Sequence, residues 1–213
     1  MKINLQNAGK RFNREWVFRH FNYEFSTGGA YAITGPNGSG KSTLLQILCG
    51  ASDLSEGVIS HNLPERISKD EVYKKTAIAA PYLELIEEMT LAEFLSFHFS
   101  LKPVLKSMNT NDVAEAIGLR DPAHKQIRYY SSGMKQRVKL GQAIFSNVPV
   151  ILLDEPCTNL DEEGIMLYKS LVTNYCSDRL VIVSSNDKNE YDFCRAVVDM
   201  KEIKNQDQVP SLS

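Results

Sequence analysis

The chain has 213 residues, which is long enough to bury one sizeable hydrophobic core. Its 24 Lys and Arg against 26 Asp and Glu give a formal net charge of -2, so no nucleic-acid footprint or polybasic membrane patch is expected. The 4 Cys are scattered and form no Cys-x-x-Cys pair, which favours reduced thiols. The 4 His lack metal-ligand spacing. No run approaches the ~18 apolar residues of a membrane span, and the N-terminus has no signal-peptide pattern. We expect a soluble protein with no nucleic-acid partner, whose membrane role, if any, comes through another protein.

The N-terminal part of the chain has a strand-like pattern. Residues 3–25 alternate between apolar and polar side chains, interrupted at Gly9 and at Asn13-Arg14. This alternation predicts strands of an antiparallel layer. Residues 30–34 are short, apolar and rich in β-forming residues, which indicates a buried strand.

A glycine-rich segment follows this strand and organises the chain. It matches the phosphate-binding pattern G-x-x-x-x-G-K-[ST] at every fixed position, with Gly35, Pro36, Asn37, Gly38, Ser39, Gly40, Lys41, Ser42 and Thr43. A helix is predicted from Thr43 to Cys49, so the order is strand, glycine loop, helix. Backbone N–H groups of such a loop, with the positive end of the helix dipole, bind phosphate. Lys41 would reach the β- and γ-phosphates and Ser42 would hold Mg²⁺. A glycine turn that merely joins a strand to a helix would not need those two residues, so we predict a nucleoside triphosphate site.

The middle of the chain reads as further strands and then a helical lobe. A turn at 52–57 leads to a short strand at 58–60, and a strand at 76–80 is stopped by Pro81. Thr90 and Glu93 form a capping box that opens a helix with one face made of Leu91, Phe94, Leu95 and His98. A second helix is predicted from Asn111 to Ile117. The aromatic residues of the first helix are interpreted as core rather than as a docking stripe: Phe94, Phe97 and Phe99.

The second half of the chain alternates helices with fully apolar strands. We predict a helix from the segment Ser131–Arg137 through Phe145, strands at 150–155, 180–185 and 195–200, a helix N-capped by Asp161 and running to Cys176, and a frayed tail from Lys204 to Ser213. This order is typical of a mostly parallel sheet covered on both faces, in an α/β fold. We predict one domain, residues 1–213, with the β layer and nucleotide core at about 1–89 and 146–213 and an inserted α-helical subdomain at about 90–145.

Two carboxylates end the strand at 150–155. In a phosphate-loop protein, an Asp at this point holds Mg²⁺, so Asp154 is predicted to face Ser42 across the metal. Glu155 can polarise the water that attacks the γ-phosphate, which favours hydrolysis of ATP over transfer to a small acceptor. The alternative is that both residues cap a strand and face solvent.

These motifs together resemble the ATP-binding subunits of the ABC transporter family. The resemblance rests on the phosphate loop, the segment Ser131–Arg137, the strand Ile151–Pro156 and the stretch Asn159–Asp161. It implies a P-loop NTPase core of the RecA type, with ATP and Mg²⁺ as ligands. It also implies a head-to-tail dimer in which two ATP molecules lie between two chains, expected to be identical. Ser131 and Gly133 of one chain would contact the γ-phosphate held by the other, and Leu160 and Asp161 would couple the two sites. Phe12 resembles the aromatic residue that stacks on adenine; the alternative is a core aromatic of the β layer.

The family resemblance also implies a partner and a location. The ATPase subunit would drive an integral membrane permease, expected to be that of an exporter, and would lie in the cytoplasm against the inner face of the cell membrane. The permease would contact a groove lined by Tyr82, Leu83, Leu85 and Ile86. Alternatively, these four side chains pack the lobe onto the core.

Three departures from the family pattern affect the expected chemistry. The signature segment begins Tyr130-Ser131-Ser132-Gly133-Met134 instead of Leu-Ser-Gly-Gly-Gln, a variant similar to exporter-type members. The glutamine expected after the strand at 76–80 is absent, and Pro81 takes its place, so Glu84 or water substitutes or coupling is looser. The switch histidine is replaced by Asn186, which can donate a hydrogen bond to a γ-phosphate oxygen but cannot carry a proton. We therefore predict slower turnover with ATP binding largely intact.

Three other functions share parts of this sequence pattern. A soluble ABC-type ATPase for DNA or ribosome work would carry a coiled-coil insertion or two ATP-binding units, and the sequence has neither. A regulatory module that binds nucleotide and hardly hydrolyses it would fit the missing Gln and His but not the retained Glu155. A small-molecule kinase would share the phosphate loop but would not need the signature segment.

Overall fold

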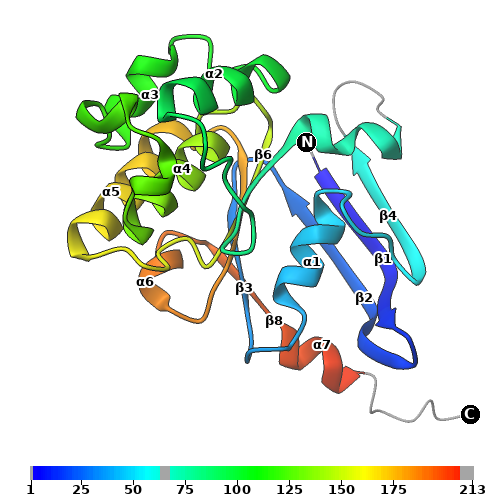
Figure 1. Cartoon of the computed structure of the whole chain (residues 1–213). Helices are drawn as coiled ribbons and strands as arrows, with labels where there is room; N and C mark the ends of the chain where they lie inside the picture. Colours follow the sequence, from blue (N-terminus) through cyan, green and yellow to red (C-terminus); the bar gives the residue numbers. More distant parts are fainter. Residues whose placement is uncertain (1, 63–67, 207–213) are drawn as a thin grey trace, which may run out of the picture.

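The described part of the chain folds into a five-stranded sheet, a three-stranded sheet and the helices that pack against them (Figure 1). The computed structural model describes residues 2–62 and 68–206. The strands are β1 (Lys2–Phe12), β2 (Glu15–Ser26), β3 (Ala30–Thr34), β4 (Glu56–Asn62), β5 (Thr76–Ala79), β6 (Val150–Asp154), β7 (Leu180–Ser184) and β8 (Ala196–Asp199). The α-helices are α1 (Lys41–Leu48), α2 (Leu91–Leu101), α3 (Thr110–Ala116), α4 (Ser132–Ile144), α5 (Glu162–Tyr175), α6 (Lys188–Tyr191) and α7 (Met200–Gln206). Short 3-10 helices are η1 (Lys69–Lys75), η2 (Asp121–His124) and η3 (Ile127–Tyr129).

The central sheet is parallel and covered on both faces, as predicted. Its strand order is β5-β6-β7-β3-β8, and every neighbouring pair runs parallel. Strand β6 shows why its sequence is apolar throughout: Ile151 and Leu153 enter a cluster with the helices α2–α5, whereas Val150 and Leu152 enter a cluster with α1. The carboxyl ends of β3, β6 and β7 therefore meet at one edge, where ligands of such sheets bind.

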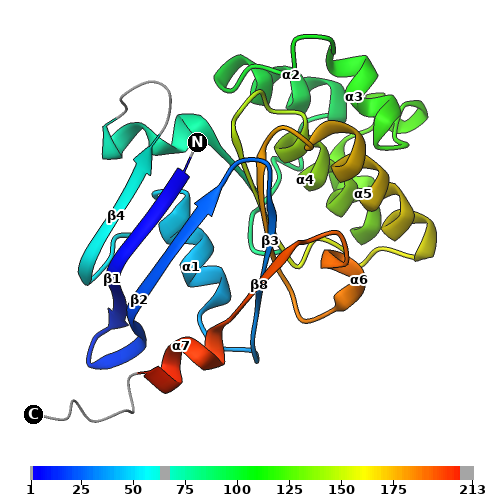
Figure 2. The ribbon, with the colours of Figure 1, turned by 180° about the vertical axis from the view of Figure 1, so that it is seen from behind.

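The second sheet confirms the predicted antiparallel layer. Its order is β2-β1-β4, and Ile3 of β1 lies opposite Phe25 of β2. Helix α1 lies between this layer and the parallel sheet, a position that both views show (Figures 1 and 2). Strand β4 runs from Glu56 to Asn62 and is longer than the predicted 58–60, because its polar end residues pair with β1 although they lack strand character.

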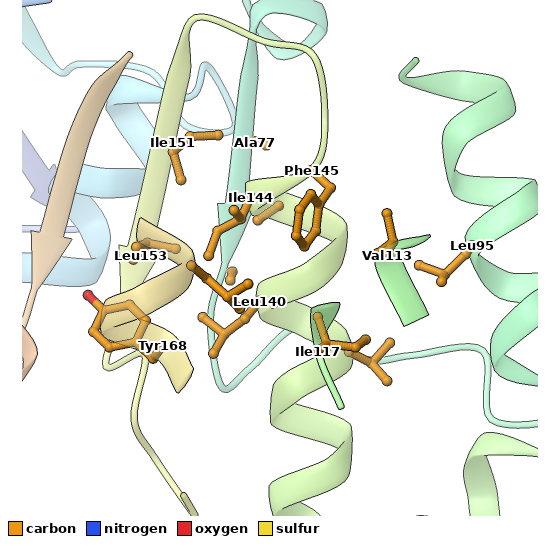
Figure 3. Close-up of a cluster of buried hydrophobic side chains, with 14 of the residues drawn as sticks. Ala77, Leu95, Val113, Ile117, Leu140, Ile144, Phe145, Ile151, Leu153 and Tyr168 are labelled. Atoms are coloured by element: carbon orange, nitrogen blue, oxygen red, sulfur yellow. The ribbon is translucent and has the colours of Figure 1, made fainter. Parts of the chain in front are cut away.

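The helical segment shares its core with the parallel sheet. The capping box of α2 forms as predicted: Thr90 N–H donates to Glu93 Oε2 over 2.8 Å and Glu93 N–H donates to Thr90 Oγ1 over 3.3 Å. In the buried cluster, Leu95 and Val113 lie beside α4, whose Leu140 and Ile144 approach Ile151 and Leu153 of the sheet (Figure 3). This continuity supports our proposal of a single domain.

Two expectations about this architecture were wrong. Phe97 is 45% exposed, because the buried face of α2 is formed by Leu91, Phe94 and Leu95 and position 97 points away from it; Phe94 is buried and Phe99 packs against the core. The expected strand end at Met200 and frayed tail from Lys204 are replaced by α7 as far as Gln206. Asp199 Oδ1 accepts a hydrogen bond from Lys201 N–H over 2.8 Å, and Met200 and Ile203 are buried. Residues 207–213 lie outside the described residues.

Candidate nucleotide-binding site

The phosphate-binding segment joins β3 to α1 and forms the wall of a hollow of about 480 Å³. Its lining residues are Phe12, Val17, Asn37, Gly38, Gly40, Lys41, Ser42, Thr43 and Glu155. Gly40 has φ 105°, and a Cβ there would lie 2.2 Å from Val17 Cγ1, so only glycine fits. Lys41 is 6% exposed, and its Nζ donates to Gly35 O over 2.8 Å. The ammonium group is therefore already held within the loop that would contact phosphate.

Phe12 lies at the end of β1 and is 53% exposed. Lys10 Nζ lies 4.9 Å from the centre of its ring. The alternative that Phe12 is a core aromatic of the β layer is therefore excluded. An exposed aromatic ring on the wall of this hollow offers a flat face to a planar base.

The two carboxylates at the end of β6 occupy different environments. Asp154 is 2% exposed, and its Oδ1 has no hydrogen-bond partner among residues 2–62 and 68–206. Glu155 is exposed and has φ 42°, an unusual left-handed conformation for a residue other than glycine, while its N–H donates to Ser184 O over 2.8 Å. The alternative that both side chains face solvent fails for Asp154.

The residues present fit a magnesium ion held together with a nucleotide. Mg²⁺ prefers oxygen ligands and is usually held by one or two protein side chains together with phosphates and water. The unpartnered Asp154 Oδ1 and the Ser42 hydroxyl supply such oxygens. Within the described part of the chain, no group of three or more His, Cys, Asp or Glu side chains could hold a metal ion.

Asn186 follows β7 and is attached to the phosphate-binding segment. Its Oδ1 accepts a hydrogen bond from Gly35 N–H over 3.0 Å. Because the amide oxygen is engaged with the backbone, the NH₂ group remains as the donor. The structure thus brings Asn186 to the loop that carries Lys41.

The signature residues lie in a separate hollow of about 410 Å³. Ser131 is the N-cap of α4, and its Oγ accepts a hydrogen bond from Met134 N–H over 3.2 Å. A Cβ on Gly133 would lie 2.9 Å from Asn159 O. Asp161 pairs with Arg137 at 3.7 Å between Oδ1 and Nη2 and caps α5 by accepting from Gly164 N–H. This hollow shares no lining residue with the hollow at the phosphate-binding segment.

A third hollow, of about 480 Å³, is lined by the turn after β5 and by residues of α4. Leu83 and Leu85 line it, together with Glu84, Glu87, Glu88, Lys135, Lys139 and Pro81. Leu85 is buried, whereas Tyr82 is 46% and Ile86 is 40% exposed. Of the residues predicted to form the permease groove, Leu85 therefore packs inward, whereas Tyr82 and Ile86 remain on the surface.

One residue of the nucleotide hollow and two buried polar residues near the turn after β6 were missed by the sequence reasoning. Val17 of β2 lines the nucleotide hollow. The available sequence signal was that Val17 is apolar but lies on the opposite face of the strand from its neighbours Trp16 and Phe18. Gln136 is buried, and its Nε2 donates to Pro156 O over 2.7 Å, which ties α4 to the turn after Glu155. Glu190 is buried, and its Oε1 accepts from Cys157 N–H over 2.9 Å. Burial raises the pKa of Glu190.

Comparison with known proteins defines the class to which this fold and site belong. The ABC transporter family matches residues 18–158, which is more than half of the chain, so the chain belongs to the ABC transporter family. Members of this family bind and hydrolyse ATP, and the chain is an ATP-binding cassette with ATPase chemistry.

Three relatives show how far the similarity extends. The chain is 28% identical over 193 residues to the uncharacterized ABC transporter ATP-binding protein YhcH of Bacillus subtilis, covering 86% of this chain and 61% of YhcH. It is 33% identical over 151 residues to the cytochrome c biogenesis ATP-binding export protein CcmA of Xylella fastidiosa, covering 71% and 68%. It is 31% identical over 164 residues to the maltose/maltodextrin import ATP-binding protein MalK of Mannheimia succiniciproducens, covering 75% and 44%. The chain thus spans less than two thirds of YhcH and MalK.

A solved structure shares the fold. The dimeric structure of MJ0796, a bacterial ABC transporter cassette, superposes with a TM-score of 0.77 at 23% identity, covering 93% of this chain and 94% of that one. Among the helices within residues 2–62 and 68–206, none is both long and apolar enough to cross a membrane.

Proposed function

We propose that this chain is the ATP-hydrolysing subunit of an ABC exporter and works as a head-to-tail dimer bound to a membrane permease. The observation that carries this proposal is the separation of two polar half-sites on one chain. The hollow at the phosphate-binding segment and the hollow at Ser131 and Gly133 share no residue. In a head-to-tail pair, each half-site would face its complement, so the signature residues of one chain would complete the site of the other.

Within one site, the residues divide the work of hydrolysis. Phe12 would stack on adenine, and the backbone N–H groups of residues 35–43 would bind the phosphates. Ser42 and Asp154 would hold Mg²⁺, which neutralises phosphate charge when bound. Glu155 would accept a proton from the attacking water, and Lys41 would stabilise charge on the transferred phosphoryl group.

Asn186 would act differently from the histidine that it replaces. Its Oδ1 is engaged by Gly35 N–H, so its NH₂ group would donate to a γ-phosphate oxygen. A neutral amide supplies a weaker hydrogen bond than a charged imidazolium, since charge-assisted bonds are roughly twice as strong. We expect slow turnover for this reason.

The permease would dock at the third hollow. Leu83 and Leu85 give this groove an apolar wall, and Tyr82 and Ile86 extend the apolar surface beside it. The exporter direction is supported by the export role in the name of CcmA, of which the chain covers a larger share than of the importer subunit MalK. Docking would place the chain in the cytoplasm, on the inner face of the cell membrane.

Purification from native membranes tests the permease. A tagged chain should bring down a stoichiometric polytopic membrane protein, whose identity would narrow the transported substrate. Leu83→Asp should reduce recovery of the membrane protein while leaving ATP binding intact. The control Leu101→Asp, at a residue 72% exposed at the end of α2, should leave the recovery unchanged. If only soluble partners were recovered and the chain were absent from the membrane fraction, the transporter proposal would be wrong.

A further inference from the structure

One peptide group in the turn after β6 is held on both sides by buried side chains. Gln136 Nε2 of α4 donates to Pro156 O over 2.7 Å, and Cys157 N–H donates to Glu190 Oε1 of α6 over 2.9 Å. Both backbone groups belong to the peptide bond between Pro156 and Cys157, which is trans, so its C=O and N–H point in opposite directions. Helices α4 and α6 therefore hold this one peptide plane between them.

The held peptide limits the conformation of Glu155. Between Glu155 Cα and the Pro156–Cys157 peptide, the backbone can rotate only about ψ of Glu155 and ψ of Pro156, because the proline ring fixes φ. On the other side, Glu155 N–H donates to Ser184 O over 2.8 Å. The backbone of Glu155 is thus fixed from before and after. This explains how its φ of 42° is maintained although the conformation is strained.

Glu190 is itself held in place by the surrounding structure. The buried hydroxyl of Tyr168 donates to Glu190 O over 2.8 Å, which joins α5 to α6. Glu190 lies four residues after Asn186, whose side chain accepts a hydrogen bond from the phosphate-binding segment. The short segment 186–190 therefore contacts both the loop that would bind phosphate and the turn after β6.

The surroundings of Glu190 suit a hydrogen-bond acceptor rather than a second base. The side chain is 6% exposed and is not among the residues that line the nucleotide hollow in the described part of the chain. Its Oε2 has no hydrogen-bond partner within residues 2–62 and 68–206, and burial raises the pKa of the carboxyl group. A protonated acid still accepts through its carbonyl oxygen, as the amide of a glutamine does. The contact with Cys157 N–H therefore needs an acceptor and not a charge.

We propose that Glu190 is a positioning residue for Glu155: together with Gln136 it holds the Pro156–Cys157 peptide and so sets the direction in which the Glu155 carboxylate enters the nucleotide hollow. The proposal rests on the proposed function, in which Glu155 accepts a proton from the attacking water. Glu190 contacts neither the nucleotide nor this water. A general base must lie within hydrogen-bond reach of the proton that it accepts, and a misplacement of about 1 Å costs about 100-fold in rate.

Hydrolysis and nucleotide affinity, measured separately, test this role. Glu190→Leu removes the acceptor, so single-turnover phosphate release from bound ATP should slow about tenfold to 100-fold. The affinity for the non-hydrolysable analogue adenosine 5′-(β,γ-imido)triphosphate, measured by calorimetry, should stay unchanged. Glu190→Gln keeps the acceptor and should retain the rate of hydrolysis. The control for lost stability is Val113→Ala, at a buried residue of α3, which should lower Tm and leave the rate and the affinity unchanged well below Tm.

A double substitution tests whether Glu190 acts through Glu155. In the Glu155→Gln background, Glu190→Leu should slow the residual phosphate release no further, because both changes disable the same step. Gln136→Leu releases the same peptide from the other side and should reproduce the loss, and it serves as the test if Glu190→Leu fails to fold. No slowing in Glu190→Leu, equal slowing in Glu190→Gln, a parallel loss of affinity, or the same factor of slowing in both backgrounds would overturn the proposal. If Glu155→Gln alone kept full turnover, the role of Glu155 in the proposed function would fail instead.

Discussion

The backbone conformation of Glu155 lowers the stability of the folded chain. Its φ of 42° lies in the left-handed region, which costs a residue with a Cβ roughly 1–2 kcal/mol. Strain of this kind persists where the surrounding structure fixes it, and it gathers at functional sites. The hydrogen bond from Glu155 N–H to Ser184 O fixes the turn here and directs the side chain into the nucleotide hollow.

Replacing Glu155 should therefore separate stability from activity. Asn tolerates the left-handed region, so Glu155→Asn should raise the free energy of unfolding by about 1 kcal/mol, which is about 2–4 °C in Tm for a chain of this size. Glu155→Gln removes the same charge without that preference and should raise Tm less. Both should lower ATP turnover about 100-fold or more, with ATP binding retained. Thermal unfolding and phosphate release measure the two effects, and equal Tm values for both variants would argue against strain.

Asn186 gives a second prediction at the scale of one side chain. Asn186→His restores a group that can carry a proton and a positive charge, so turnover should rise about threefold or more while ATP affinity changes little. The matched control is Asn189→His on the exposed side of α6, which should change neither value. Unchanged turnover in Asn186→His would show that this position does not limit hydrolysis.

At the scale of elements, His98 joins α2 to the end of α4 and makes this contact sensitive to acid. Ser146 Oγ donates to Gln142 O over 2.6 Å, so it accepts from His98 Nε2 at 3.0 Å, which fixes a neutral imidazole protonated at Nε2. Burial, with the nearby charge of Lys102, lowers the pKa of His98 to about 4 from a usual value of 6.5. Between these two values the unfolded chain binds more protons than the folded chain, so stability falls as pH falls from 6.5 to 4.

Removing this histidine should flatten the response to pH. In urea unfolding at about pH 7.5 and about pH 5, His98→Gln should lose less stability than the unaltered chain, by on the order of 1 kcal/mol after allowing for partial exposure. His124→Gln, at an exposed histidine of η2, provides the control. If His98→Gln lost as much stability as the unaltered chain, the contact between α2 and α4 would not be the acid-sensitive one.

The sequence predicted which segments form strands and helices better than it predicted where these elements end and which residues they contact. Strands β3, β6 and β7 and helices α4 and α5 could be predicted because each has a clear apolar period or a capping residue. Helix α7 was missed, although Asp199 as a cap and Met200 and Ile203 three apart are a usable signal. Val17 joined the site only in the structure, and the contact between Gln136 and the turn after Glu155 was also missed, because both depend on contacts between segments that are distant in the sequence.

At the scale of the whole molecule, the two proposed half-sites lie in separate hollows of one chain. Local motifs predicted Lys41 and Gly133 as binding residues. The strand order β5-β6-β7-β3-β8 could not be predicted from local patterns, yet it is this order that brings the ends of β3, β6 and β7 together. The signature residues at the start of α4 lie in a different hollow, and a second copy of the chain would supply what each half-site lacks.

Mixing two inactive variants tests this central claim most directly. Lys41→Ala removes the phosphate contact from one half-site, and Gly133→Asp places a side chain against Asn159 O and a negative charge in the other. Each variant alone should be inactive, but a mixed pair contains one site in which both halves are intact. An equal mixture should recover about a quarter of the original ATP turnover, because about half of the dimers are mixed and each has one working site. If the mixture stayed as inactive as its components, or if Gly133→Asp alone kept full turnover, the two hollows would not form one shared site.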